Sequence, residues 1–332
     1  MSQLAEQQRE TAKKLQKTIC LPESVLEART MKAARSFLDE GLGIPMVVGT
    51  PDALQKTADE AGVSLDGMKV VDIEKFERLD EMVALYQERR AKDNMTDEQV
   101  RELLSDPLWF GAMLLKMGEA DGMTAGAVNT TGNVIRASIK CIGTRKGLRT
   151  VSSSFIMVTQ VSDYGKNGAL IFSDCGVIPA PTPDQLVDIG DAAADTCRQL
   201  LDIEPVIAYL SFSTKGSADH PDAIKMADAA KALKERRPEL TVDGELQGDS
   251  ALVASVGEKK CPGSPVAGKA NVLIFPDLGA GNIAYKLTQR LGQADAYGPL
   301  LQGLDLPVND LSRGCAWETI VQVACITALQ TQ

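Results

Sequence analysis

Short apolar runs alternate with amphipathic stretches along the first third of the chain. KTICLP, IPMVVG and MKVVDI predict strands. Between them, LEARTMKAARSFLDEG and PDALQKTADEAG predict helices, the first of which ends at a glycine. Strands that alternate with helices are typical of parallel sheets covered by helices. The pattern therefore predicts an α/β fold.

The next segment changes from charged helical sequence to small residues. Residues 79–119 are mostly helical in pattern, and Thr96 three residues ahead of Gln99 predicts a capping box. The stretch that follows, GEADGMTAGAVNTTGNVIRASIKCIG, is rich in glycine, and we expect a helix to open in it near Asn133.

The α/β pattern then returns. The predicted strands are RTVSSSFIMV, GALIFSDCGV, PVIAYLSFS and ANVLIFPD. The predicted helices are PTPDQLVDIGDAAADTCRQLL with Pro183 in its first turn, HPDAIKMADAAKALKERRPE, NIAYKLTQRLG and an apolar-striped final helix, WETIVQVACITALQ. Because 332 residues are many for one core, we expect two domains, with a first boundary near residue 147.

Composition narrows the classes of partner. The formal net charge is -10, so a basic surface for a nucleic-acid backbone is not expected. Aromatic residues make up 4%, so a surface on which bases stack is not expected either. No apolar run approaches 18 residues, and the polar N-terminus is unlike a signal peptide, so we expect no membrane association. The seven cysteines form no CxxC pair, which predicts reduced thiols in a cytoplasmic protein.

The single histidine, His220, predicts a surface or helix-start residue. With one histidine, a histidine-based zinc site is excluded, and we expect no metal. Against an acidic background, arginines that gather locally suggest an anionic ligand.

Three arginine-bearing segments stand out. The first carries Asn129, Thr130, Thr131 and Arg136, the second Lys286 and Arg290, and the third Asp310, Ser312 and Arg313. Hydroxyls, backbone amides and a guanidinium fork together suit phosphate. Taken alone, the first segment is more often a plain helix start and the second a solvated helix face, and the third is as well explained by a capped turn.

Two glycine motifs suggest nucleotide sites. GSPVAGKA resembles a P-loop, but Ala270 stands where a Ser or Thr would hold magnesium, and a strand follows it instead of a helix. GAGNIA follows a predicted strand and opens a helix, which fits a dinucleotide fingerprint and makes a nicotinamide dehydrogenase the rival hypothesis. Its acidic partner would be Asp295 or Asp305, neither of which ends a convincing strand.

Longer segments resemble the phosphate acetyl/butyryltransferase family, and within it the enzymes that transfer acetyl groups. They are DGMTAGAVNTTGNVIR, LSFSTKGSA, DGELQGDSALV, PGSPVAGKANVLIFPDLGAGNIAYKLTQRL and GPLLQGLDLPVNDLSRGC. The resemblance runs from KTICLPES to the last helix and also accounts for both glycine motifs.

The resemblance implies two α/β/α domains with a cleft between them, in an architecture like that of isocitrate and isopropylmalate dehydrogenases. The domains would be residues 1–147 with 303–332, and residues 148–302. It implies a homodimer without metal or bound cofactor. The implied reaction, part of acetate metabolism, is direct transfer in a ternary complex: acetyl-CoA and phosphate give acetyl phosphate and coenzyme A.

The resemblance also assigns site residues. Its phosphate- and carbonyl-binding arginines fall on Arg136, Arg290 and Arg313, and its active-site serine on Ser312. A further arginine falls on Arg89, or on Arg90 if the local alignment shifts. Asn129, Thr130, Thr131 and Asp310 are then expected to bind substrate. Cationic and N–H donors suit the oxyanion of acyl transfer.

One position departs from the family pattern. Thr319 stands where the family has the aspartate that serves as base for the CoA thiol, and a hydroxyl is too weak for that role. Glu318 or Asp310 could substitute, or the enzyme could be slow. The alternatives are transfer of butyryl or another short acyl group, and an acetyl-CoA-binding paralogue without turnover.

Overall fold

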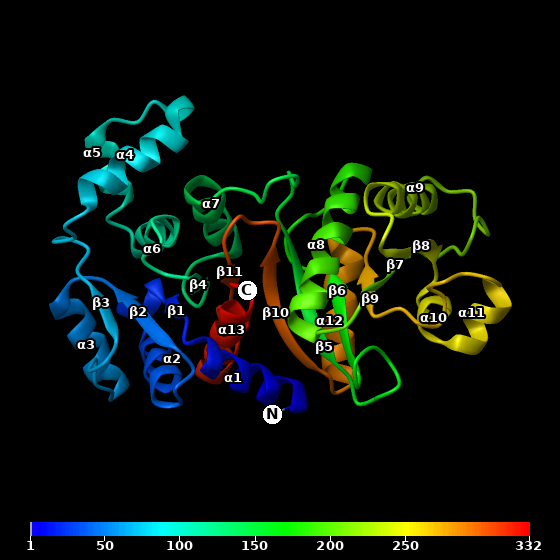
Figure 1. The fold of residues 1–332 in the computed structure, drawn as a ribbon, viewed down its shortest axis with the longest axis horizontal. Coiled ribbons are helices and arrows are strands. Elements are labelled where there is room, and N and C mark those ends of the chain that lie inside the picture. Colours follow the sequence, from blue (N-terminus) through cyan, green and yellow to red (C-terminus); the bar gives the residue numbers. More distant parts are fainter. Residues whose placement is uncertain (1) are drawn as a thin grey trace. The chain divides into compact units, whose positions relative to one another are not determined.

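The computed structural model describes residues 2–332, and these form two compact units (Figure 1). The first unit comprises Gln3–Lys146 and Leu304–Gln332, and the second comprises Gly147–Gly303. Each unit is a sheet covered by helices, which confirms the α/β prediction.

The sheet of the first unit is parallel throughout, in the order β11-β4-β1-β2-β3. The strands are β1 (Thr18–Cys20), β2 (Ile44–Val48), β3 (Lys69–Val71), β4 (Gly122–Ala125) and β11 (Val308–Asp310). β4 and β11 were not predicted, because each is short and β11 is largely polar. Their register places Asp310 beside Ala125, at the carboxyl ends of the two strands.

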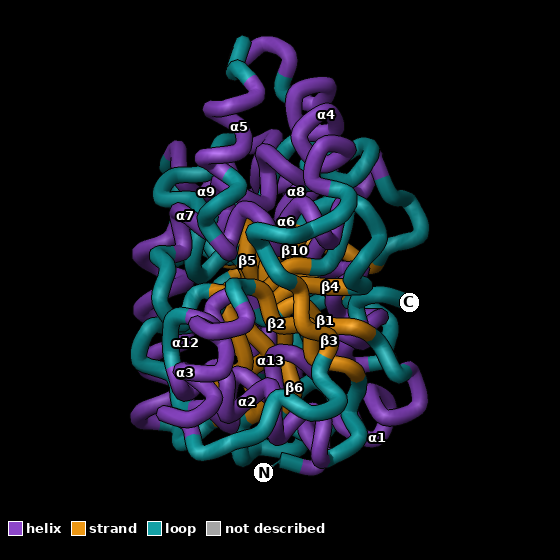
Figure 2. Tube along the Cα trace, turned by 90° about the vertical axis from the view of Figure 1, so that its left-hand side faces the viewer, coloured by secondary structure: helices purple, strands orange, loops and turns teal. Residues whose placement is uncertain are grey.

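Helices and two 3-10 turns surround this sheet. They are α1 (Gln3–Leu15), η1 (Pro22–Val25), α2 (Ala28–Asp39), α3 (Pro51–Ala61), α4 (Leu79–Arg89), η2 (Ala91–Asp93), α5 (Asp97–Leu103), α6 (Pro107–Lys116), α7 (Thr131–Cys141) and α13 (Trp317–Leu329). The sheet lies between α6 and α7 on one side and α1, α2 and α13 on the other (Figures 1 and 2). The predicted apolar stripe of α13 is buried from Ile320 onward.

The second unit has a mixed sheet, in the order β10-β5-β6-β9-β7-β8. Its strands are β5 (Ser152–Val158), β6 (Ala169–Ser173), β7 (Val206–Leu210), β8 (Thr241–Leu246), β9 (Val272–Ile274) and β10 (Asp295–Gln302). β5 pairs antiparallel with both β6 and β10, so the expectation of parallel strands is wrong there. The physical reason is the connection: β5 reaches β6 through a short loop, whereas a parallel pair needs a crossover.

Helices cover both faces of the second sheet, which explains its continuous apolar runs. They are α8 (Pro183–Leu201), α9 (Pro221–Arg236), α10 (Gly248–Leu252), α11 (Ala254–Lys260) and α12 (Leu278–Leu291). On one face, Phe155 stacks on Tyr285 of α12 with ring centroids 4.1 Å apart. On the other, the buried Tyr209 hydroxyl donates to the Leu186 carbonyl of α8 at 2.9 Å.

Several local predictions are confirmed. Thr96 and Gln99 form the capping box, Pro183 is the first residue of α8, and His220 is the exposed N-cap of α9. β10 was missed because Gly298 and Pro299 interrupt its pattern. A proline in a strand is tolerated at a sheet edge, and β10 is an edge strand.

Candidate active site

A buried carboxylate organises the loop that follows β4. Glu23, fully buried in η1, accepts hydrogen bonds from the backbone amides of Gly126, Ala127 and Asn129 at 2.7–2.9 Å. It also accepts one from the Asn129 side chain at 2.9 Å. Amides expected to face an anion are therefore already bound to Glu23. Sequence reasoning missed this residue, although a carboxylate among apolar residues in CLPESV was a signal.

The helix α7 opens directly after this loop. Its N-cap is Thr130, whose hydroxyl accepts from the Asn133 amide at 3.2 Å, so the helix begins at Thr131, two residues before the predicted position near Asn133. Asn133 is instead the third residue of the helix, where an N-cap hydroxyl finds its donor. Arg136 follows on the same helix with an exposed side chain.

Thr131 connects α7 to the end of β11. Its hydroxyl donates to Oδ2 of Asp310 at 2.5 Å, while Oδ1 of Asp310 has no hydrogen-bond partner within residues 2–332. Asp310 is fully buried. Gly126 makes room for it: φ there is +110°, and an added Cβ would lie 2.2 Å from the carboxylate. The sequence-predicted Thr131 and Asp310 are thus in direct contact.

The surroundings of Asp310 change its acidity. Burial raises the pKa of this carboxyl from its usual 3.8 to about 7, and the nearby Glu23 charge adds to the rise. The Thr131 hydroxyl and the Leu311 amide act in the opposite direction. A carboxyl with this pKa exchanges a proton near neutral pH.

Arg29 fastens the turn that carries Ser312 and Arg313. Its guanidinium donates to the carbonyl of Cys315, to that of Arg313 at 3.2 Å and to that of Ala127 at 3.5 Å. The turn is closed by the Cys315 amide, which donates to the Ser312 carbonyl at 2.9 Å. The side chains of Ser312 and Arg313 remain exposed. Sequence reasoning missed Arg29, which reads as an ordinary charged residue of α2.

The two candidate base positions lie in the first turn of α13. Glu318 is exposed, and Thr319 is half-buried with its amide donating to the Ala316 carbonyl at 3.0 Å. The start of the helix is held by Lys32, whose ammonium lies 4.5 Å from the centre of the Trp317 ring.

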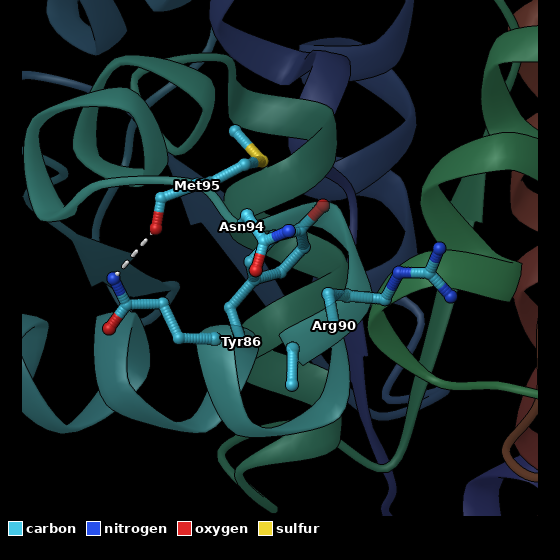
Figure 3. A pocket seen from close by; sticks show the side chains of 6 residues that line it. Tyr86, Arg90, Asn94 and Met95 are labelled. Carbon is cyan, nitrogen blue, oxygen red and sulfur yellow. Dashed lines mark hydrogen bonds between the residues drawn. The ribbon is translucent and has the colours of Figure 1, made fainter.

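Arg89 and its neighbour Arg90 have different surroundings. Arg89 donates to the Ile142 carbonyl at 2.5 Å and so holds the end of α7. Arg90 pairs with Asp93 at 2.9 Å. Arg90 also borders a cavity of about 220 Å³ (Figure 3), whose other lining residues are Tyr86, Gln87, Ala91, Asn94 and Met95.

Arg290 belongs to the second unit, in the last turn of α12, and is exposed. The helix is capped by Asp277, which accepts from the Ala280 amide at 2.8 Å. The GAGNIA glycines lie inside this helix, and Gly281 packs so closely that an added Cβ would lie 2.3 Å from the Asp174 carbonyl. Asp295 begins the antiparallel strand β10, so it does not supply the acidic residue of a dinucleotide fingerprint.

The predicted ligand arginines share one property. Most arginine side chains in residues 2–332 pair with a carboxylate or a carbonyl. Within that range, the side chains of four have neither a hydrogen bond nor an ion pair: Arg136, Arg149, Arg290 and Arg313. Three of these are the residues assigned to phosphate and carbonyl binding. Their guanidinium groups keep all their donors available to an anion.

Two further features of the described residues bear on the class of site. His, Cys, Asp and Glu side chains in residues 2–332 form no group of three that could hold a metal ion. In the same range, the helices lack the combination of length and apolar sequence needed to cross a membrane. All seven cysteines within residues 2–332 are free thiols, and all except Cys315 are buried.

Comparison with known proteins gives consistent matches over almost the whole chain. The family described as phosphate acetyl/butaryl transferase matches residues 3–328. A phosphate acetyltransferase of Acetivibrio thermocellus is 46% identical over 323 residues, which are 97% of this chain and 96% of that protein. One of Treponema pallidum is 45% identical over 95% of each chain.

Solved structures agree with these relatives. A phosphotransacetylase of Streptococcus pyogenes has a TM-score of 0.93 and 38% identity, covering 100% of this chain and 99% of that one. A 4-hydroxythreonine-4-phosphate dehydrogenase of Burkholderia phymatum has a TM-score of 0.52 and 14% identity, covering 93% of this chain and 97% of that one. The second likeness concerns the fold alone and agrees with the dehydrogenase-like architecture predicted from the sequence.

Proposed function

Because this chain belongs to the phosphate acetyl/butyryltransferase family, we propose that it is a phosphate acetyltransferase. It converts acetyl-CoA and phosphate to acetyl phosphate and coenzyme A, reversibly. The observation that carries the proposal is the near full-length identity of 39–46% to proteins named phosphate acetyltransferase. Neither transfer of a longer acyl group nor binding without turnover is favoured by those relatives.

The exposed, unpaired arginines support binding of phosphate and of the developing oxyanion, and we propose direct transfer between the two substrates. In this account a phosphate oxygen attacks the thioester carbonyl, the oxyanion collapses, and the CoA thiolate leaves. Arg313, Arg136 and Arg290 bind the phosphate and the carbonyl oxygen as negative charge develops there. Ser312 donates a hydrogen bond from the same turn as Arg313. The resemblance adds Asn129, Thr130 and Arg89 to the substrate-binding set; Asn129 is held in place there by Glu23, and Arg89 by the Ile142 carbonyl. Holding both substrates together supplies rate through proximity, so the enzyme needs no covalent nucleophile and no bound cofactor.

Assembly and location are part of the proposal. Ile283, Leu287 and Leu291 form an apolar stripe on α12 and are exposed by 60%, 52% and 79%. Such a stripe supports a homodimer in which α12 is covered. Free thiols support a reducing compartment, and hence the cytoplasm.

The test is phosphate-dependent release of the CoA thiol from acetyl-CoA, with butyryl-CoA in parallel. We expect release only when phosphate is present, with acetyl-CoA the better substrate. Thiol release without phosphate would indicate a thioesterase, and faster reaction of butyryl-CoA would indicate the other branch of the family.

A further inference from the structure

Acetyl transfer from acetyl phosphate to coenzyme A requires a group that takes the thiol proton. By the resemblance described above, Thr319 takes the place of a carboxylate, and a hydroxyl cannot hold the proton. Glu318, next to it, is exposed on the first turn of α13 and has the surroundings of an ordinary surface carboxylate. The structure contains a different carboxylate close to the turn of Ser312 and Arg313.

We propose that Asp310 accepts the proton of the CoA thiol through the hydroxyl of Thr131. This inference rests on the proposed function and names the proton acceptor of that reaction. Three observations carry it: the contact between the two side chains, the unpaired oxygen of Asp310, and the position of both residues beside the candidate phosphate-binding turn.

The contact is short and crosses between two elements. The Thr131 hydroxyl lies 2.5 Å from Oδ2 of Asp310, in the range of a hydrogen bond to a charged oxygen. Thr131 is half-buried, whereas Asp310 is fully buried. Of the two residues, Thr131 is the one with exposed surface, so in this proposal its hydroxyl connects the substrate to the buried carboxylate.

The second oxygen of Asp310 shows that the carboxylate is not simply a structural acceptor. Oδ1 makes no hydrogen bond of ordinary geometry in residues 2–332, and the Leu311 amide gives the carboxyl only a contribution smaller than that of burial. Leaving a buried carboxylate oxygen without a full hydrogen bond costs free energy. Glu23 provides the contrast, because both of its oxygens accept backbone and side-chain hydrogen bonds from the neighbouring loop. Of these two buried carboxylates, Glu23 holds the loop in place and Asp310 is available for proton transfer.

The groups around Asp310 suit this role. Glu23 from η1 contributes negative charge, Thr131 from α7 donates a hydrogen bond, and the Leu311 amide is adjacent. Burial and the Glu23 charge raise the pKa of Asp310 to about 7. A base with its pKa near the working pH combines an available unprotonated form with sufficient proton affinity.

The proton balance is simple. The thiol S–H bond breaks and its proton passes to Oγ1 of Thr131, while the original Thr131 proton passes to Oδ2 of Asp310. A thiol and a carboxylate thereby become a thiolate and a carboxylic acid. The thiolate then attacks the acetyl carbonyl and phosphate leaves. In the opposite direction Asp310 returns the proton to the departing thiolate by the same route.

The test is the pH dependence of acetyl-CoA formation in the full chain and in Asp310→Asn. Asparagine keeps the shape and can still accept from Thr131, but it cannot take a proton. We expect a loss of about 10²–10⁴-fold near pH 7. The loss should shrink as the pH approaches about 8.5, where a thiol ionises without help. The KM for acetyl phosphate should change little.

Thr131 variants separate the relay from local structure. Thr131→Ser keeps the hydroxyl and should retain most activity, whereas Thr131→Val should show the same pH-dependent loss as Asp310→Asn. The helix cap is made by Thr130, so it remains in both variants. Asp305→Asn is the matched control, because Asp305 is a surface carboxylate paired with Lys116, and it should leave the profile unchanged.

Two outcomes would overturn the inference. One is a wild-type pH profile in Asp310→Asn, and the other is a loss that stays constant from pH 6 to pH 9. The melting temperature gives an independent check, because replacing a buried carboxylate whose pKa is raised should increase it at pH 8. An Asp310→Asn variant that fails to fold contradicts the account. A wild-type chain that forms no acetyl-CoA at any pH refutes the proposed function itself, and the inference with it.

Discussion

The two units hold their candidate ligand arginines in different ways. In the first, Arg313 sits on a turn fastened by the Arg29 guanidinium, and Arg136 on a helix that follows a loop held by buried Glu23. In the second, Arg290 sits near the end of α12, whose one fully buried residue within the described chain is Gly281. Apolar packing through Tyr285 and one cap at Asp277 position that helix.

The two units differ in how firmly the backbone that carries the ligand arginines is held before substrate binds. Buried charged groups with several hydrogen bonds fix a backbone in one arrangement, because any other arrangement leaves them unpaired. A helix held mainly by packing on one face tolerates small shifts. We therefore expect the first unit to hold the reacting groups rigidly, and the second to contribute binding with more freedom.

The largest expected effect is the difference in activity between arginine-to-alanine variants of the two units. Arg313→Ala should lower the rate of acetyl transfer by about 10³-fold, because it removes a charged donor from a fixed position. Arg290→Ala should lower it by about 10-fold and act mainly on the KM for phosphate. Steady-state kinetics with varied phosphate give both numbers. Equal losses would break the comparison.

Arg149→Ala is the matched control for those variants. Arg149 is exposed, and its side chain has no partner within residues 2–332, but nothing assigns it to the site. Its removal should leave the rate within about twofold of the parent. A loss comparable to that of Arg313→Ala would mean that Arg149 also belongs to the site and that the resemblance missed it.

The next effect tests the fastening of the turn. Arg29→Gln should reduce kcat by on the order of 10–100-fold, because three carbonyls of two loops lose a common donor. Arg29→Lys should recover little, since an ammonium cannot reproduce the planar fork. Kinetics together with thermal unfolding distinguish a displaced turn from an unfolded unit. Full activity in Arg29→Lys would indicate that charge alone is required.

Replacing Asp310 should increase the stability of the fold at high pH. Because the pKa of its carboxyl is raised to about 7, the folded state retains a proton that the unfolded chain releases from about pH 4 upward. The wild type therefore loses stability as the pH rises through this window, and Asp310→Asn does not. The variant should match the wild type at pH 4 and exceed it by on the order of 2–4 kcal/mol at pH 8. Urea unfolding at both pH values measures this, and a variant less stable at pH 8 would contradict it.

The smallest effect concerns the two helix caps. Asp277→Ala and Thr130→Ala should each lower the free energy of unfolding by about 1 kcal/mol. The loss of activity should be larger for Thr130→Ala, because α7 carries Thr131 and Arg136. If both variants lose equal stability and keep equal activity, then catalysis depends no more on the local geometry of the first unit than on that of the second.

The alternation of strands and helices could be predicted from the sequence because each element buries an apolar face with its own period. The missed strands lack that signal: β4 consists largely of small residues, β11 is short and polar, and β10 contains Gly298 and Pro299. Their strand character comes from the neighbours with which they pair, which the local sequence does not show.

The site could be predicted only in part, for a related reason. Resemblance and residue type pointed to Arg136, Arg313, Thr131 and Asp310, and the last two are in contact. Glu23 and Arg29 were missed because their roles depend on partners about 100 and 286 residues away. Such contacts arise from the parallel order of β11, β4 and β1, and no local pattern reveals them.

The most direct test of the whole account is acetyl-CoA formation from acetyl phosphate and coenzyme A at pH 7.5, followed by thioester absorbance, in the wild type and in Thr319→Asp. The account predicts robust activity in the wild type and little gain in the variant, because Asp310 already takes the proton. Activity that appears only in Thr319→Asp would show that the chain lacks a working base, and no activity in either would contradict the assignment as a phosphate acetyltransferase.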